Sequence, residues 1–202
     1  MNSSVVGVAQ EHWRVDVTDK FLTVCLTFDF DALSVWLAGS SRPTPAELSR
    51  GEYGPRVAIP RILHLLAAYD LPATFFVPGH TAESFPGAVE AIFDAGHEIA
   101  HHGYGHEDPS AQSPDQERRS LEQGIAVLER FLGVPPSGYR SPSWDYSDAT
   151  LSLLVEYGFL YDSSLFGGDA PYRLSVYEPA VELLEIPIDW SKDDAAYFLF
   201  FK

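Results

Sequence analysis

The feature that most constrains the fold is an alternation of short apolar runs with longer stretches of helical spacing. The apolar runs are rich in branched and aromatic residues, which is typical of buried β-strands. In Arg56–Tyr69, apolar residues recur at the intervals of one helix face. Strands that alternate with helices indicate βαβ units and a parallel sheet. The predicted strands are residues 21–28, 73–77, 98–100, 159–161 and 182–190, with one more ending near residue 138, and the predicted helices are residues 56–69, 85–95, 113–132 and 147–157.

Residues suited to chemistry stand at the ends of five of these strands. In barrels and open sheets of the α/β class, active sites gather where the carboxyl ends of parallel strands meet. We therefore expect one site assembled from several strand ends. The residues at those ends are Asp29, Asp31, His80, His102, His106, Arg140, Trp144 and Asp162.

The segment Gly96–Pro109 holds four of the seven histidines. If residues 98–100 form a strand, His97 and His101 stand about 13 Å apart, too far to bind one metal ion. His102 and His106 bracket a glycine-rich segment that can curl and bring both rings to one side. This pair is therefore the predicted ligand pair, and His97 and His101 are predicted to pack or to support it. A histidine pair alone is more often an ordinary surface or core feature.

Asp29 and Asp31 directly follow the first predicted strand. Side chains two positions apart on a strand point to the same side, about 6.6 Å apart along it. One carboxylate could bind a metal while the other moves a proton, and this spacing leaves open which does which. The simpler alternative is that one of them caps the following turn.

Other segments carry weaker predictions. Ala32–Tyr53 is rich in Ser, Pro and Gly and is predicted to be a loop over the strand ends, with Trp36 as a lid or wall residue. The single cysteine, Cys25, lies in the first predicted strand and is expected to be a small buried hydrophobe. With one cysteine, no disulfide forms within the chain.

Length and charge exclude some classes of protein. The 202 residues fit one domain, residues 1–202. The formal net charge of −16, without lysine or arginine clusters, argues against nucleic acid and anionic membranes as partners. No signal peptide and no transmembrane run is evident, so we expect a cytoplasmic protein. The apolar end Ala195–Lys202 suggests that the domain is incomplete at its C-terminus, and it could drive homo-oligomer formation.

Six segments, in order along the chain, resemble the polysaccharide deacetylases, the NodB-homology family also called carbohydrate esterase family 4. The likeness is to the branch with peptidoglycan deacetylase-like, cyclic imidase-like and allantoinase-like members. It implies a distorted (β/α) barrel of the NodB-homology type, here incomplete at the C-terminus. The matching segments are Thr27–Ala32, Gly51–Arg56, Ala73–Glu83, Gly96–Glu107, Gly138–Trp144 and Tyr161–Leu165.

The resemblance implies roles for particular residues. Asp31, His102 and His106 would bind one divalent metal ion, with zinc expected first and cobalt, nickel or manganese as alternatives. Asp29 would be the catalytic base, and Arg140 would hold it and keep it ionised. A backbone N–H, that of Ser143, is a candidate to bind the oxyanion. The predicted contacts to a small-molecule or glycan substrate are Trp144, Trp190, Tyr104 and His80.

The implied reaction is hydrolysis of a non-peptide C–N bond, the deacetylation of an N-acetylated sugar or a related substrate. A cyclic imide or ureide hydrolase is the alternative within the family. The family supplies a late histidine that protonates the leaving amine, but no histidine follows His106 here. A non-catalytic metal-binding relic is therefore another alternative. Two histidines and one carboxylate also serve non-haem iron oxygenases, although Asp29 and Arg140 argue against that class.

Overall fold

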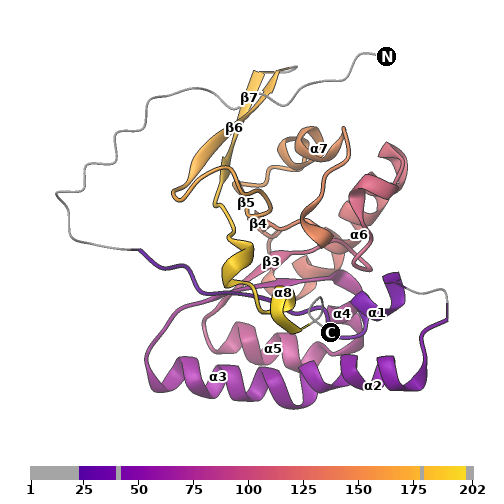
Figure 1. Ribbon diagram of the computed structural model, residues 1–202, viewed down its shortest axis with the longest axis vertical. Helices are drawn as coiled ribbons and strands as arrows, with labels where there is room; N and C mark the ends of the chain where they lie inside the picture. Colours follow the sequence, from indigo (N-terminus) through magenta and orange to yellow (C-terminus); the bar gives the residue numbers. More distant parts are fainter. Residues whose placement is uncertain (1–22, 40–41, 178–179, 199–202) are drawn as a thin grey trace.

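The computed structural model describes residues 23–39, 42–177 and 180–198, which form a seven-stranded sheet with helices packed beside it (Figure 1). The sheet order is β1-β2-β3-β4-β5-β7-β6, and all neighbours are parallel except β6 and β7. The predicted parallel α/β sheet is confirmed. The sheet is open, with β1 and β6 at its edges, as expected for an incomplete barrel. The strands are β1 (Thr27–Asp29), β2 (Thr74–Val77), β3 (Glu98–His101), β4 (Gly138–Tyr139), β5 (Tyr161–Asp162), β6 (Tyr172–Tyr177) and β7 (Ala180–Glu185).

The predicted helices are present, and their ends follow the expected capping chemistry. The longest, α6, begins after a capping box between Ser113 and Gln116 and ends at Gly133, which has a left-handed φ of 75°. In Figure 1, α3, α5, α6 and α7 follow one another along the sheet. No helix in the described parts of the chain is long and apolar enough to cross a membrane. The helices are α1 (Ser34–Gly39), α2 (Pro45–Tyr53), the π-helical η1 (Gly54–Ala58), α3 (Ile59–Ala68), α4 (Gly79–Ser84), α5 (Pro86–Asp94), α6 (Pro114–Leu132), α7 (Thr150–Glu156) and α8 (Asp194–Phe198), with short 3-10 turns at η2 (Pro109–Ala111), η3 (Pro142–Trp144) and η4 (Trp190–Lys192).

Strand alternation separates the apolar core from the functional face of the sheet. Phe28 and Phe30 pack with Phe75 in the core that includes the helices. Side chains one position away point to the opposite face. Thr27 and Asp29 accordingly reach Arg140 on that face.

The prediction of a loop over Ala32–Tyr53 is wrong, because α1 and α2 occupy most of it. Pro45, one of the residues that suggested a loop, is a helix-start signal: it lies in the first turn of α2, after a capping box formed by Thr44 and Glu47. Trp36 lies in α1, with the Arg50 guanidinium 5.8 Å from its ring centroid. The described contact of the Trp36 ring is thus with a residue of α2, and its predicted role as a lid or wall residue stays a prediction.

The first and last predicted strands also need correction. Residues 23–26 are not in a strand and Cys25 is exposed, because only the three residues of β1 pair with β2. Phe21 and Leu22, like the end of the apolar tail at residues 199–202, lie outside the described residues. The predicted strand over residues 182–190 ends at Glu185, two residues before Pro187, which lacks an N–H for a ladder. Its antiparallel partner β6 was not predicted.

Two carboxyl groups are buried together where β5 and β7 end. Asp162 and Glu185 are register partners, and both are 0% exposed. The Tyr146 hydroxyl donates to Asp162, and the Ser164 N–H donates to both carboxyl groups at 3.0 Å. Burial, with the adjacent Asp162, raises the pKa of Glu185 to about 10. Glu185 is therefore protonated at neutral pH.

This proton predicts a pH dependence of stability. The unfolded glutamate has a pKa near 4.5, so the folded state binds more protons between that pH and about 10. The free energy of unfolding should therefore fall as pH rises through this window, by up to about 1.4 kcal/mol per pH unit. Glu185→Gln should flatten the fall, as measured by urea unfolding at pH 5.5, 7 and 8.5. Parallel curves for the parent and Glu185→Gln would contradict the assignment.

Candidate metal centre

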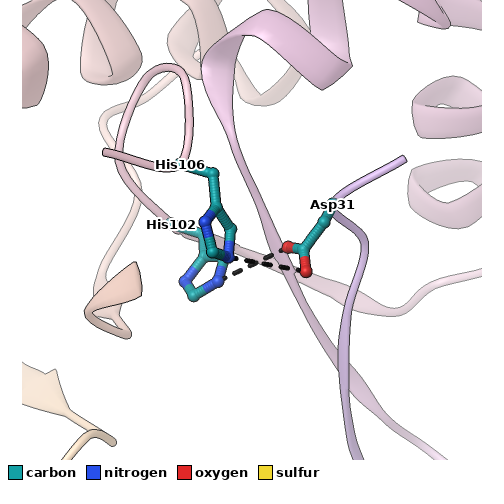
Figure 2. A group of neighbouring side chains, drawn as sticks. All are labelled: Asp31, His102 and His106. Atoms are coloured by element: carbon teal, nitrogen blue, oxygen red, sulfur yellow. Dashed lines mark ion pairs between the residues drawn. The ribbon is translucent and has the colours of Figure 1, made fainter. Parts of the chain in front are cut away.

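Three side chains converge at the carboxyl edge of the sheet (Figure 2). Asp31 follows β1, and His102 and His106 follow β3. The His102 Nε2 atom lies 3.5 Å from Asp31 Oδ1, and the His106 Nε2 atom lies 3.6 Å from Asp31 Oδ2. One potential ligand atom from each residue lies within 4.8 Å of the others. The structure thus brings together the three residues predicted to bind metal, and their role as ligands stays a prediction.

The His102 ring is set in the form that binds metals. Its Nδ1–H donates to the Arg140 carbonyl oxygen at 2.7 Å, which leaves the Nε2 lone pair facing Asp31. In metal-binding histidines, a hydrogen bond donated by the ring nitrogen that does not bind the ion fixes the tautomer and the orientation of the ring. Burial lowers the pKa of His102 to about 4, so the ring is neutral at pH 7.

The carboxylate of Asp31 is largely buried without a described positively charged partner of its own, an environment that a bound cation would stabilise. Its Oδ1 atom is buried and has no hydrogen-bond partner among the described residues. Burial, together with the neighbouring Asp29, raises the pKa of Asp31 well above its usual value. A divalent cation held by Asp31, His102 and His106 would satisfy this oxygen, so the donor set fits such an ion.

Asp29 lies beside these residues but is held by a different partner. Its Oδ1 accepts from Arg140 Nη1 at 2.7 Å, while its Oδ2 lies 3.9 Å from His102 Nε2. Burial alone would raise the pKa of Asp29. The positive charge and hydrogen bond of Arg140, with smaller contributions from His102 and His106, outweigh burial and lower this pKa. Asp29 is therefore an ionised carboxylate with one oxygen free of Arg140.

The loops that carry the site are conformationally strained. Four of the five non-glycine residues with positive φ in the described chain follow β1, β3 or β4: Ala32 (48°), His106 (63°), Ser143 (62°) and Trp144 (54°). This conformation costs a residue with a Cβ roughly 1–2 kcal/mol. Such strain persists only where the surroundings hold it, and it is frequent at functional sites.

Two helical glycines let helices approach these loops closely. A Cβ on Gly51 in α2 would lie 2.7 Å from the Ala32 carbonyl oxygen, next to Asp31. A Cβ on Gly124 in α6 would lie 2.2 Å from His101 Nε2 and 3.0 Å from the Gly103 oxygen. The backbone on either side of the site therefore rests directly on helices.

His97 and His101 do not join the three converging residues. His101 points to the helix side of the sheet, where its Nε2–H donates to the Leu121 oxygen at 3.2 Å. Its burial lowers its pKa to about 3. The His97 ring centroid lies 5.6 Å from that of Phe75. The packing role predicted for both is confirmed.

The four predicted substrate contacts lie in α4, in the loop after β3, in η3 and in η4, and their roles stay predictions. His80 Nδ1 is 3.1 Å from the Ser34 hydroxyl oxygen. The Tyr104 hydroxyl donates a hydrogen bond at 2.9 Å to Glu83, which lies in α4. The rings of Trp144 and Trp190 lie 5.5 Å apart at 32°, with Trp190 54% exposed. These indoles form an apolar wall that joins η3 to η4.

Several supporting residues were not predicted. Ser163 accepts two hydrogen bonds from Arg140, at its carbonyl and at its hydroxyl oxygen. The Arg140 guanidinium carbon lies 4.0 Å from the Phe76 ring centroid. Asp193 adds its negative charge to the effects that raise the pKa of Asp31. Ser163 and Phe76 fall inside the matching segments, but Asp193 was marked only by the acidic pair that it forms with Asp194.

Comparisons with known proteins agree on one family. Residues 52–161 match the family model described as polysaccharide deacetylase. The chain is 36% identical over 206 residues to the peptidoglycan deacetylase of Helicobacter pylori, an alignment that covers 91% of this chain and 70% of that protein.

Solved structures give the same result. A protein from Mycobacterium smegmatis assigned to the polysaccharide deacetylases is 43% identical, with a TM-score of 0.79, covering 85% of this chain and 60% of that one. The allantoinase Puue is 28% identical, with a TM-score of 0.70, covering 82% of this chain and 61% of that one. The chain thus spans less than two thirds of each structure.

The converging residues predict one bound divalent ion. After zinc reconstitution, elemental analysis of the parent should give about one equivalent of metal, because the ligand atoms of three residues face one point. The Asp31→Ala, His102→Ala double variant should lose it, and His64→Ala, which alters an exposed histidine of α3, should keep it. A parent without metal, or metal retained in the double variant, would contradict the site.

Proposed function

The chain belongs to the polysaccharide deacetylase family, and we propose that it is a metal-dependent hydrolase that removes the acetyl group from an N-acetylated sugar. The bond broken is then an amide C–N bond outside the peptide class. The observation that carries the proposal is that a group of residues able to bind a cation lies next to an ionised carboxylate able to accept a proton, at one edge of the sheet. Asp31 converges with His102 and His106, while Asp29 stays bound to Arg140 beside them.

The site residues divide into those that would hold a cation and those that would move a proton. A cation at Asp31, His102 and His106 would supply a Lewis acid, which lowers the pKa of water and polarises an amide carbonyl. Zinc suits two imidazoles and one carboxylate, and cobalt, nickel or manganese is compatible with them. Whichever of these metals is bound, the two histidines must be neutral to offer a lone pair, as His102 is at pH 7.

Asp29 is the proposed base. Arg140 occupies its Oδ1 and holds its pKa low, so Oδ2 is the oxygen available to take a proton from the attacking water. The acid formed in this way can return that proton to the leaving amine. This route needs no later histidine.

The substrate class is proposed from the relatives and from the aromatic wall. The Helicobacter pylori protein is named for peptidoglycan, whose sugars are N-acetylated. The Trp144–Trp190 pair offers an apolar surface on which the face of a sugar ring can rest. The likeness to the allantoinase Puue makes a cyclic ureide or imide the competing substrate.

The first prediction separates the base from the metal ligands. Asp29→Asn should lower kcat by about 10²–10⁴-fold, because proton transfer by a positioned side chain contributes this much. Its zinc content should match the parent, since Asp29 lies outside the ligand set. Asp115→Asn, on the outer surface of α6, is the matched control and should keep full activity. Undiminished turnover by Asp29→Asn would remove Asp29 as the base.

The second prediction concerns the substrate. The zinc-loaded chain should release acetate from N-acetylglucosamine oligosaccharides, measured by a coupled acetate assay. It should leave allantoin and succinimide intact, as followed by ring-opening absorbance. Ring opening without acetate release would favour the cyclic ureide or imide hydrolase. Bound zinc with neither activity would favour the non-catalytic relic.

A further inference from the structure

His106 differs from His102 in how its ring is held. The ring of His102 donates to the main chain of another strand end, at Arg140. The ring of His106 instead lies near side chains, with its Nε2 3.6 Å from Asp31 Oδ2 and its centroid 5.1 Å from that of the His102 ring. Its backbone is left-handed, with φ of 63°, a conformation that a residue with a Cβ adopts at a cost. The position of the His106 ring therefore depends on whatever holds the loop around it.

A single carboxylate closes that loop. Oε2 of Glu107 accepts the N–H of Gly105 at 2.8 Å and the hydroxyl of Ser120 at 2.9 Å. Ser120 lies in α6, and its oxygen accepts the N–H of Tyr104 at 3.2 Å. The two amides that precede His106 are thus tied to α6 through one hydroxyl and one carboxylate. The proton count is consistent, because the serine donates once and accepts once.

The packing leaves room for this arrangement. A Cβ on Gly105 would lie 2.8 Å from Oε1 of Glu107, so the carboxylate packs closely against the Gly105 backbone. The carboxylate therefore lies against the same turn whose amide it binds. It is not one of the three converging residues, and its Oε2 faces two donors of the loop and α6.

We propose that Glu107 is a positioning residue for the metal centre, which holds His106 in its strained conformation through Gly105 and Ser120. The inference rests on the proposed function, because it assigns Glu107 a role in zinc affinity. Partners that orient a metal ligand typically contribute 10–100-fold to metal affinity. A merely structural glutamate would contribute to folding without this effect.

Glu117 provides a matched control. It is a buried glutamate of α6 that lines the same small cavity as Glu107. Its carboxylate accepts the hydroxyls of Ser147 and Thr150, near the start of α7. Removing it should destabilise the fold as much as removing Glu107, without loosening the loop of His106.

The experiment measures the zinc dissociation constant by competition with a chromophoric chelator, and the melting temperature of the metal-free chain. Glu107→Ala should weaken zinc binding roughly 10–100-fold. Glu107→Gln, which keeps an oxygen acceptor, should recover most of the affinity. Ser120→Ala, which breaks one of the two links, should fall between Glu107→Ala and the parent. Glu117→Ala should lower the melting temperature and leave zinc affinity close to that of the parent.

Each other outcome overturns the proposal. It fails if Glu107→Ala binds zinc as the parent does, or if Glu117→Ala weakens zinc binding equally. Should Glu107→Ala not fold, zinc affinity of Ser120→Ala equal to that of the parent would overturn it instead. A parent that binds no zinc would remove the metal site itself, a failure distinct from a parent that binds zinc without needing Glu107.

Discussion

The ion pair between Arg140 and Asp29 is the interaction on which the functional face depends. The Arg140 side chain extends from the end of β4. Its guanidinium donates hydrogen bonds to Asp29 and Thr27 on β1 and to Ser163, which follows β5. Its flat face rests on Phe76 of β2. A buried charge is costly unless it is paired and hydrogen-bonded, and here every part of the guanidinium meets this condition. One side chain therefore fixes the relative positions of four strand ends and leaves one oxygen of Asp29 free.

Around this fixed point, the site is built from strained loops held by rigid elements. Ala32, which follows Asp31, and His106 itself adopt left-handed backbone conformations. Close packing at Gly51 and Gly124 sets helices against the same loops. The carboxylate Asp31 is buried without a hydrogen-bond partner for Oδ1 in the described structure. Strain and an unsatisfied oxygen are both costs to folding, and a bound cation would offset the second of them.

Sequence patterns predicted the parallel sheet, its main helices and the residues that meet at the site. They failed where local signals were ambiguous. Proline is found in loops and at helix starts alike, so Pro45 favoured a loop where α2 begins. β6 was missed because its partner β7 lies downstream of it, and pairing between segments is not encoded locally. Cys25 lies in an apolar run that resembles a strand, although only the last part of that run pairs with β2.

The sequence by itself determined the residue types that the chemistry needs and the strand ends that bring them to one edge. It also separated His97 from His101, which lie too far apart along a strand to share one ion, because a strand rises about 3.3 Å per residue. Tertiary structure alone decided which atoms meet. It placed the Arg140 carbonyl on His102 Nδ1, the guanidinium on Asp29, and the Glu107 carboxylate on the loop of His106. These contacts join parts of the chain brought together by sheet register and close packing, and side-chain periodicity carries no information about either.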